Sequence, residues 1–375
     1  MVFSWVSGVV IQLLTAKDEL PYVNQITTMV SVLNFAVAVL AIQLQWPLIA
    51  YFVAYTLVQL TPIPFYVSRL RVYPLRRMAL LMPRWNGVAF REVLSYSLTI
   101  FAMGVFQLTA NHFRPLLLGK FGGGTAVLTD YRVMQTVAML IVAIGGGFMQ
   151  VLLPSASKAY AEGDSRRMER LIFESTRYIS AFLAFMVFVL ILNAGDLLAL
   201  YMGEDYRGLS AWLSIWLLTV LLSLHNTPVA SLVLSTGKTK PLVYSSGIAC
   251  VASLPVTALL ADSLQAGAAV VGYLVYMVLQ IGFFYGYYIP RVLQLNGSRL
   301  LLHAFLPAVA GASGALVAAC GLSDWLSLPA GYGTLIVKTG IFAVTYGLFL
   351  LVAVVRPSDI QYLKTMLNVK GRRDA

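Results

Sequence analysis

Residues 125–151, TAVLTDYRVMQTVAMLIVAIGGGFMQV, form a long and almost unbroken apolar run. An α-helix needs about 20 such residues to cross the hydrocarbon core of a bilayer. Only helices and closed barrels satisfy all their backbone hydrogen bonds there, and this run lacks the strict alternation of a barrel strand. The stretch therefore predicts a transmembrane helix, and it sets the interpretation of the sequence on either side.

The composition of the whole chain agrees with that interpretation. Hydrophobic residues make up 59% of the sequence, charged residues only 11%, and the mean hydropathy is +0.81. Soluble globular proteins carry roughly 25% charged residues. We expect an all-α, polytopic transmembrane helix bundle with one partial span at residues 2–14. The ten full spans are predicted at 25–45, 47–68, 91–113, 125–151, 177–194, 209–235, 242–261, 265–289, 303–320 and 331–355.

A polar segment, LLPSASKAYAEGDSRRMERLIFES at 152–175, separates two of these runs. Asp164 could cap a helix here, and Met168, Leu171 and Ile172 would then share one face. One interpretation is a short helix on the membrane surface, with this face in the interface and Arg166, Arg167 and Arg170 among the headgroups. The other interpretation is a solvated connector whose basic residues only set the orientation.

The basic residues divide unevenly between the two sides of the predicted bundle. If residues 69–91 are cytoplasmic, span parity places five further segments, including the C-terminal tail from 356, on the same side. These six segments hold 21 of the 26 lysines and arginines. Cytoplasmic loops of membrane proteins carry such an excess, so the net charge of +11 reflects orientation. Anionic lipids are the expected partners of these charges, and nucleic acid is not.

Cysteine and histidine give no support to metal or redox chemistry. The two cysteines, Cys250 and Cys320, lie in predicted spans, and His112, His225 and His303 are far apart in the sequence. We therefore expect no cofactor and no metal.

Two short segments resemble each other about 220 residues apart. LLTAKDELPYV at 13–23 and VLSTGKTKPLV at 233–243 both end an apolar run with Thr-x-Lys and resume with Pro-x-Val. Many transporters are built from two matched halves with the substrate between them. The match therefore favours a bundle of two pseudo-symmetric lobes.

The order LLPSASKAYAEGDSRRMERLI, a span, LLALYMGEDY, another span and SLVLSTGKTKPLVYSS resembles the polysaccharide or O-antigen flippases. These proteins belong to the multidrug/oligosaccharidyl-lipid/polysaccharide flippase superfamily. The resemblance implies a remainder of an N-terminal lobe at 1–90, a C-terminal six-helix lobe at 91–290, and two additional helices with a basic tail at 291–375. It also implies that the partial first helix is the fourth of fourteen, the first three being absent from this chain.

The resemblance implies a transporter, not an enzyme, that flips undecaprenyl-linked oligosaccharide across the bacterial inner membrane by alternating access. Polysaccharide polymerase and chain-length proteins would be further partners, and the C-terminus would be cytoplasmic. One alternative is a drug or cation antiporter of the same superfamily, which should use buried acids. Apart from Glu92 at the very start of its span, Asp130 alone lies within a predicted span. The other alternative is a membrane-embedded glycosyltransferase or polymerase. Against this alternative, the longest external segment, 195–208, places no histidine near its acids.

Arg132 is the first candidate for substrate binding. It lies about eight residues into its span, roughly 12 Å at 1.5 Å per residue. A cation at depth costs about 2.5–3.5 kcal/mol and usually faces a cavity or a partner. Asp130, two positions away, is on a different face of the helix. Arg132 would therefore bind the pyrophosphate of the substrate through its planar fork, or form an ion pair with another helix.

Three further candidates lie at the end of the preceding span and one in the last span. Gln107, Asn111 and Arg114 share one helix face, which either lines the cavity or is an ordinary helix end that meets headgroups. Lys338 lies about seven residues from the outer end of the last span. Its long side chain could contact substrate or extend to the interface.

Overall fold

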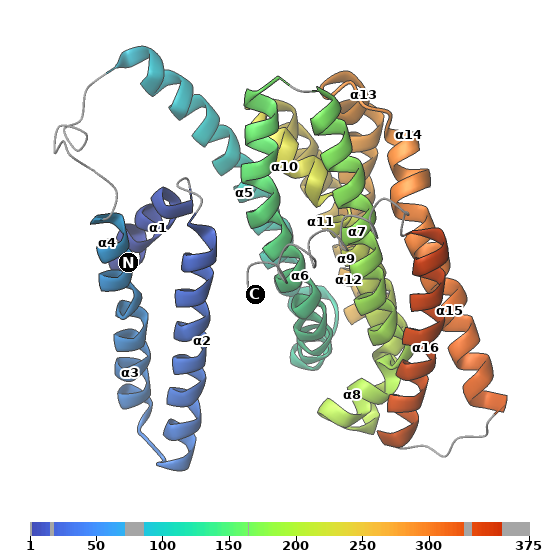
Figure 1. Ribbon diagram of the computed structural model, residues 1–375. Helices are drawn as coiled ribbons and strands as arrows, with labels where there is room; N and C mark the ends of the chain where they lie inside the picture. The colour runs from blue at the N-terminus through green and yellow to red at the C-terminus, as the bar shows by residue number, and fades with distance from the viewer. Residues whose placement is uncertain (1, 16–18, 72–85, 164, 326–331, 355–375) are drawn as a thin grey trace, which may run out of the picture. The chain divides into compact units, whose positions relative to one another are not determined.

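The structure is a computed structural model that describes residues 2–15, 19–71, 86–163, 165–325 and 332–354. Within these ranges every regular element is a helix (Figure 1), which confirms the all-α prediction. In the part of the chain that the structure describes, ten helical stretches are long and apolar enough to cross a membrane, and they overlap the ten predicted spans. Asp164 and most of the two predicted cytoplasmic segments 69–91 and 356–375 lie outside the described residues.

The chain divides into two compact units, residues 1–90 and 91–375. In the first unit the predicted partial span is helical, and the second span is interrupted near Thr61, just before Pro62. Its small core joins Leu14, Val23, Ile26 and Tyr66. The helices are α1 (Val2–Thr15), α2 (Leu20–Gln43), α3 (Leu48–Leu60) and α4 (Pro62–Arg71).

The second unit holds the remaining helices. It begins within α5 (Gly87–Phe121), which continues eight residues past the predicted end of its span. The helices that follow α5 are α6 (Thr125–Ala161), α7 (Ser165–Leu192), α8 (Ala194–Met202), η2 (Glu204–Leu209), α9 (Ser210–Leu224), α10 (Thr227–Ser235), α11 (Lys240–Leu264), α12 (Ala266–Phe283), η3 (Phe284–Tyr288), α13 (Ile289–Arg291), α14 (Gly297–Leu300), η4 (Leu301–Phe305), α15 (Leu306–Trp325) and α16 (Tyr332–Ala353).

The main core of this unit lies where α6, α7, α9, α12 and α15 pack together. The buried residues that α15 contributes to this core are all alanines, as expected where helices pack closely in a membrane: Ala308, Ala312, Ala315 and Ala319. Tyr346 of α16 connects α7 and α15. Its hydroxyl lies within hydrogen-bonding distance of the carbonyl oxygens of Ala181 (3.0 Å) and Ala308 (3.3 Å). The last two helices are thus part of the same compact unit.

Helix α9 is separated from α10 by a break at His225 and Asn226, with Pro228 at the start of α10. The His225 ring is fully buried; its Nδ1 lies 2.5 Å from the carbonyl oxygen of Leu222, and its Nε2 lies 2.9 Å from the hydroxyl of Tyr285. Tyr285 belongs to η3, a π-helical turn. Asn226 is among the residues that line a cavity in this unit.

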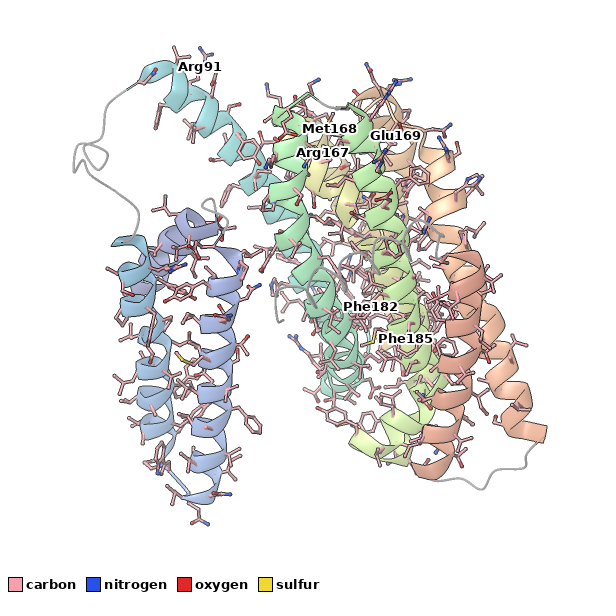
Figure 2. The ribbon with its side chains drawn as sticks, viewed as in Figure 1. Arg91, Arg167, Met168, Glu169, Phe182 and Phe185 are labelled. Carbon is pink, nitrogen blue, oxygen red and sulfur yellow. The ribbon has the colours of Figure 1, made fainter. Side chains whose placement is uncertain are left out.

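The polar segment 152–175 is not a separate surface helix. Helix α6 continues to Ala161, and α7 runs from Ser165 without a break into its span. Figure 2 shows Arg167 and Glu169 at one end of α7, with Phe182 and Phe185 further along the same helix.

The apolar face predicted for this segment packs on the protein instead of entering the membrane interface. Ile172 is only 1% exposed and belongs to a core cluster with Val229, while Met168 and Leu171 pack at its edge. The prediction that this face lies in the membrane interface was therefore wrong. The prediction of a solvated connector was also wrong for this part of the segment. The three arginines at 166, 167 and 170 are exposed, as both interpretations expected.

Candidate functional site

A small pocket of about 100 Å³ lies in the second unit between α5, α6, α9 and α12. Arg114 of α5 is the one charged residue among those that line it, and it is only 2% exposed. The sequence placed Arg114 at a helix end. Because α5 continues to Phe121, Arg114 lies inside the helix and its guanidinium points inward.

Neutral groups surround the guanidinium of Arg114. Its Nη1 donates to the side-chain oxygen of Asn111 (3.1 Å), one turn earlier on α5, and its Nη2 lies 3.4 Å from the hydroxyl of Ser253 on α11. The guanidinium carbon lies 5.3 Å from the ring centre of Tyr273 and 5.5 Å from that of Tyr276. Such cation–π contacts stabilise a positive charge without neutralising it.

The buried charge of Arg114 lacks a carboxylate partner among the described residues. Its Nε is buried and has no hydrogen-bond partner there either. A buried cation is costly unless an anion and hydrogen bonds compensate it. The pocket therefore has the electrostatics of a site that takes an anionic group, and a guanidinium offers a planar fork that suits phosphate.

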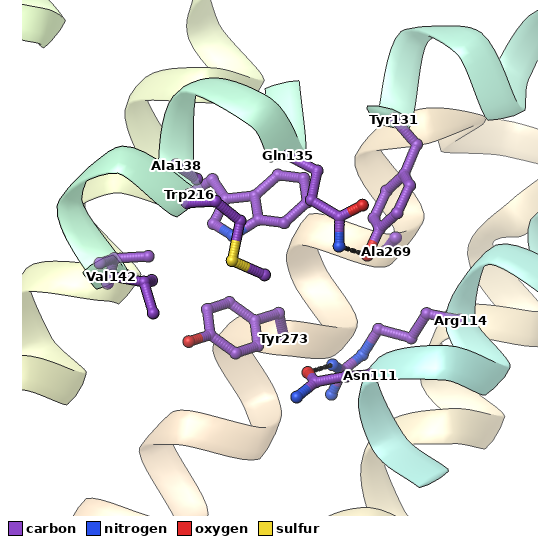
Figure 3. Close-up of a pocket in the computed structure, with 11 residues that line it drawn as sticks. Asn111, Arg114, Tyr131, Gln135, Ala138, Val142, Trp216, Ala269 and Tyr273 are labelled. Carbon is purple, nitrogen blue, oxygen red and sulfur yellow. Dashed lines mark hydrogen bonds between the residues drawn. The ribbon is translucent and has the colours of Figure 1, made fainter. Parts of the chain in front are cut away.

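Aromatic and amide side chains form the opposite wall (Figure 3). Tyr131 and Gln135 come from α6, and the amide nitrogen of Gln135 lies 3.4 Å from the Tyr131 hydroxyl. Trp216 of α9 packs on Tyr131 and Tyr273, with ring centres 5.1 Å and 6.3 Å away. At about 30 Å³ per water, the pocket holds roughly three water molecules, enough for a phosphate-sized group but not for a sugar chain.

The structure brings some predicted site residues together and separates others. Asn111 and Arg114 meet in the pocket, whereas Gln107, one turn earlier, lines a neighbouring cavity. Arg132 is exposed and lines neither, but its Nη1 donates to Gln135 (2.6 Å), which does line the Arg114 pocket. Lys338 is half-buried on α16 and lines neither.

Several lining residues were not among the predicted candidates: Tyr131, Gln135, Trp216 and Tyr273. Of these, Gln135 lies in the same run as Arg132, one helical turn later, and this spacing could have indicated it. The three aromatic residues carry no sequence signal that separates them from ordinary core.

A family described as polysaccharide biosynthesis protein matches residues 7–211. The chain belongs to this family. With its ten apolar helices, this member of the polysaccharide biosynthesis family is a multi-pass membrane protein. No curated protein and no solved structure matches it.

The family match covers only part of the pocket of this polysaccharide biosynthesis protein. It includes Asn111, Arg114, Tyr131 and Gln135, which come from α5 and α6. The residues from α9 and α12 follow the end of the match. The charged half of the pocket thus belongs to the part of the chain that matches the family.

Proposed function

We propose that this protein moves a polyprenyl diphosphate-linked oligosaccharide from the cytoplasmic to the outer leaflet of the bacterial inner membrane. The buried, uncompensated charge of Arg114 carries the proposal, together with the family and the ten apolar helices. The undecaprenyl carrier and the O-antigen pathway are part of the proposal, as are transport by alternating access and the absence of an enzymatic step.

Each part of the pocket has a task in this proposal. The Arg114 guanidinium binds the diphosphate through those of its N–H groups that reach the pocket. Asn111 and Ser253 hold the guanidinium in place, and the rings of Tyr273 and Tyr276 lower the cost of the charge when the site is empty. The prenyl chain stays in the lipid, since a long apolar chain gains nothing from a small polar pocket.

A leaflet-specific transport assay tests the proposal. The purified protein is reconstituted into vesicles with a fluorescent undecaprenyl diphosphate-linked sugar, and a membrane-impermeant quencher reports the outer-leaflet fraction over time. Vesicles with the protein should exchange the lipid between leaflets at least ten-fold faster than protein-free vesicles. Vesicles with Arg114→Gln should approach the protein-free rate. Equal rates with and without wild-type protein would reject the function.

A further inference from the structure

A second and larger cavity, of about 440 Å³, adjoins the Arg114 pocket, and Val142 of α6 lines both. Among the described residues that line the larger cavity, none is charged. Its walls come from α5, α6, the break between α9 and α10, and α12. This volume lies within the range of about 300–1,000 Å³ that is typical of sites for small organic ligands.

Asn226, in the break between α9 and α10, lines this cavity and has an unused acceptor. The residue is only 6% exposed, and its Oδ1 is buried without a hydrogen-bond partner. Although Asn226 precedes the first turn of α10, its side chain makes no capping bond to that turn. A buried acceptor without a partner is unfavourable, and most buried polar groups in proteins do have one. A ligand that donates a hydrogen bond would satisfy it.

The amide of Gln280 on α12 adds a second acceptor. Its nitrogen donates to the Ser246 hydroxyl (2.9 Å), which fixes the orientation of the amide and leaves the carbonyl oxygen for other donors. Two methionines, Met103 and Met149, supply adaptable apolar surface in the same cavity. The cavity therefore suits a ligand that is uncharged, rich in hydrogen-bond donors and partly apolar.

We infer that this cavity binds the first sugar residues of the lipid-linked oligosaccharide, an N-acylated hexosamine among them. The inference rests on the proposed function, because it assumes that the diphosphate lies at Arg114. Sugar hydroxyls and an amide N–H are neutral donors, and the methyl group of an N-acyl substituent fits against methionine. A prenyl chain would leave Asn226 unpaired. Since the diphosphate is bonded directly to the first sugar, two adjoining pockets match the order of groups in the molecule.

Two lipids that differ only in the sugar separate this inference from the proposed function. Binding of undecaprenyl diphosphate and of undecaprenyl diphospho-N-acetylglucosamine is measured on the full chain in nanodiscs. For wild-type protein, the sugar should lower the Kd at least five-fold. Asn226→Leu should reduce that gain to less than about two-fold, a loss of the size expected for one neutral hydrogen bond, and should leave the Kd of the sugar-free lipid unchanged.

Further variants keep the result interpretable. Asn193→Leu is the matched control, because Asn193 is also a buried asparagine but lines neither cavity; it should keep the full gain. Met103→Trp should abolish the gain by filling the cavity. Arg114→Gln should weaken both lipids. If it weakens neither, the diphosphate proposal fails. If it weakens both while the sugar adds no affinity to wild type, or Asn226→Leu keeps the full gain, only the sugar inference is overturned.

Discussion

At the scale of single residues, the position of Arg114 decides what the pocket can bind. A lysine at this position would carry the same charge as a compact ammonium, which lacks the planar fork and the stacking surface of a guanidinium. Here the guanidinium uses both properties, since it stacks near two tyrosine rings and forms hydrogen bonds along one edge. Arg114 also lines the pocket, where a ligand can reach it.

Substitutions at Arg114 and Arg132 should therefore differ in effect. We expect Arg114→Gln to weaken binding of undecaprenyl diphosphate by at least ten-fold, because hydrogen bonds to charged groups contribute about 1.5–3 kcal/mol. Arg114→Lys should recover only part of the loss. Arg132→Gln, which removes an exposed charge that contacts Gln135, should cost less than about three-fold. Titration in nanodiscs measures all three, and a larger loss at 132 than at 114 would reverse the assignment.

The sequence predicted several residues of the site, but it did not predict which arginine lies in the pocket. Gln107, Asn111 and Arg114 were identified because a helix repeats every 3.6 residues, which is a local property. The burial of Arg114 depends on Ser253 and Tyr273, about 140–160 positions further along the chain. No local pattern contains that information, so the exposed Arg132 ranked above the buried Arg114.

At the scale of elements, α11 and α12 form the support behind Arg114. The two helices pack closely at Gly272, where an added Cβ would lie 1.9 Å from the Thr257 hydroxyl and 3.1 Å from the backbone oxygen of Ser253. Ser253 is also the residue that contacts Arg114 from α11. Close packing at Gly272 thus helps to fix the position of the guanidinium.

Replacing Gly272 should disturb this contact. We expect Gly272→Ala to lower the stability of the protein by about 1–3 kcal/mol, because the methyl group overpacks the helix pair. Gly282→Ala is the matched control: it lies on the same helix, and its Cβ would meet nothing within 4 Å. The control should be neutral or slightly stabilising, since alanine is the better helix former. Thermal unfolding in detergent compares the two, and equal midpoints would contradict the close contact.

The packing of α7 can be tested by cysteine labelling. Ile172→Cys should react slowly with a soluble maleimide, whereas Arg170→Cys should react rapidly, because the first side chain is buried against Val229 and the second is exposed. The native Cys250 and Cys320 are first replaced by serine. The contrast should persist in detergent without lipid, since protein and not membrane covers residue 172. If residue 172 loses its protection when the lipid is removed, the membrane interface covers it, and the interfacial interpretation is correct after all.

The helices themselves were predictable, but their lengths were less so. A span is recognised from about 20 apolar residues, and all ten were found in this way. The polar ends of α6 and α7 extend well beyond the apolar runs, because helix formation continues wherever a face can pack on the protein. Hydropathy alone cannot separate such an extension from a loop.

At the scale of the whole molecule, ten spans fix which segments can share a side of the membrane. Helix α8 lies at the opposite end of the second unit from the start of α7 (Figure 1), so we expect residues 167 and 204 to face different compartments. From the excess of basic residues we expect residue 167 to lie in the cytoplasm. The lobe symmetry and the identity of the membrane rest on the family resemblance and stay predictions.

Labelling in intact cells tests this topology. An impermeant maleimide should label Glu204→Cys from outside, while Arg167→Cys and Lys240→Cys should react only after the cells are permeabilised. We expect this result because lysine and arginine are unevenly distributed between the two sides of the bundle, and this distribution sets the orientation during insertion. If residues 167 and 204 report the same side, the span between them does not cross the membrane.

The uncompensated charge of Arg114 has an electrical consequence. A charge that crosses the full membrane potential changes its energy by about 2.3 kcal/mol per 100 mV. The empty protein carries a positive charge within a span, whereas a bound diphosphate, with more than one negative charge, would reverse the local sign. If the pocket shifts through the field during transport, the voltage that favours movement of the loaded protein opposes movement of the empty one. The resting potential then acts on the two halves of the cycle in opposite directions.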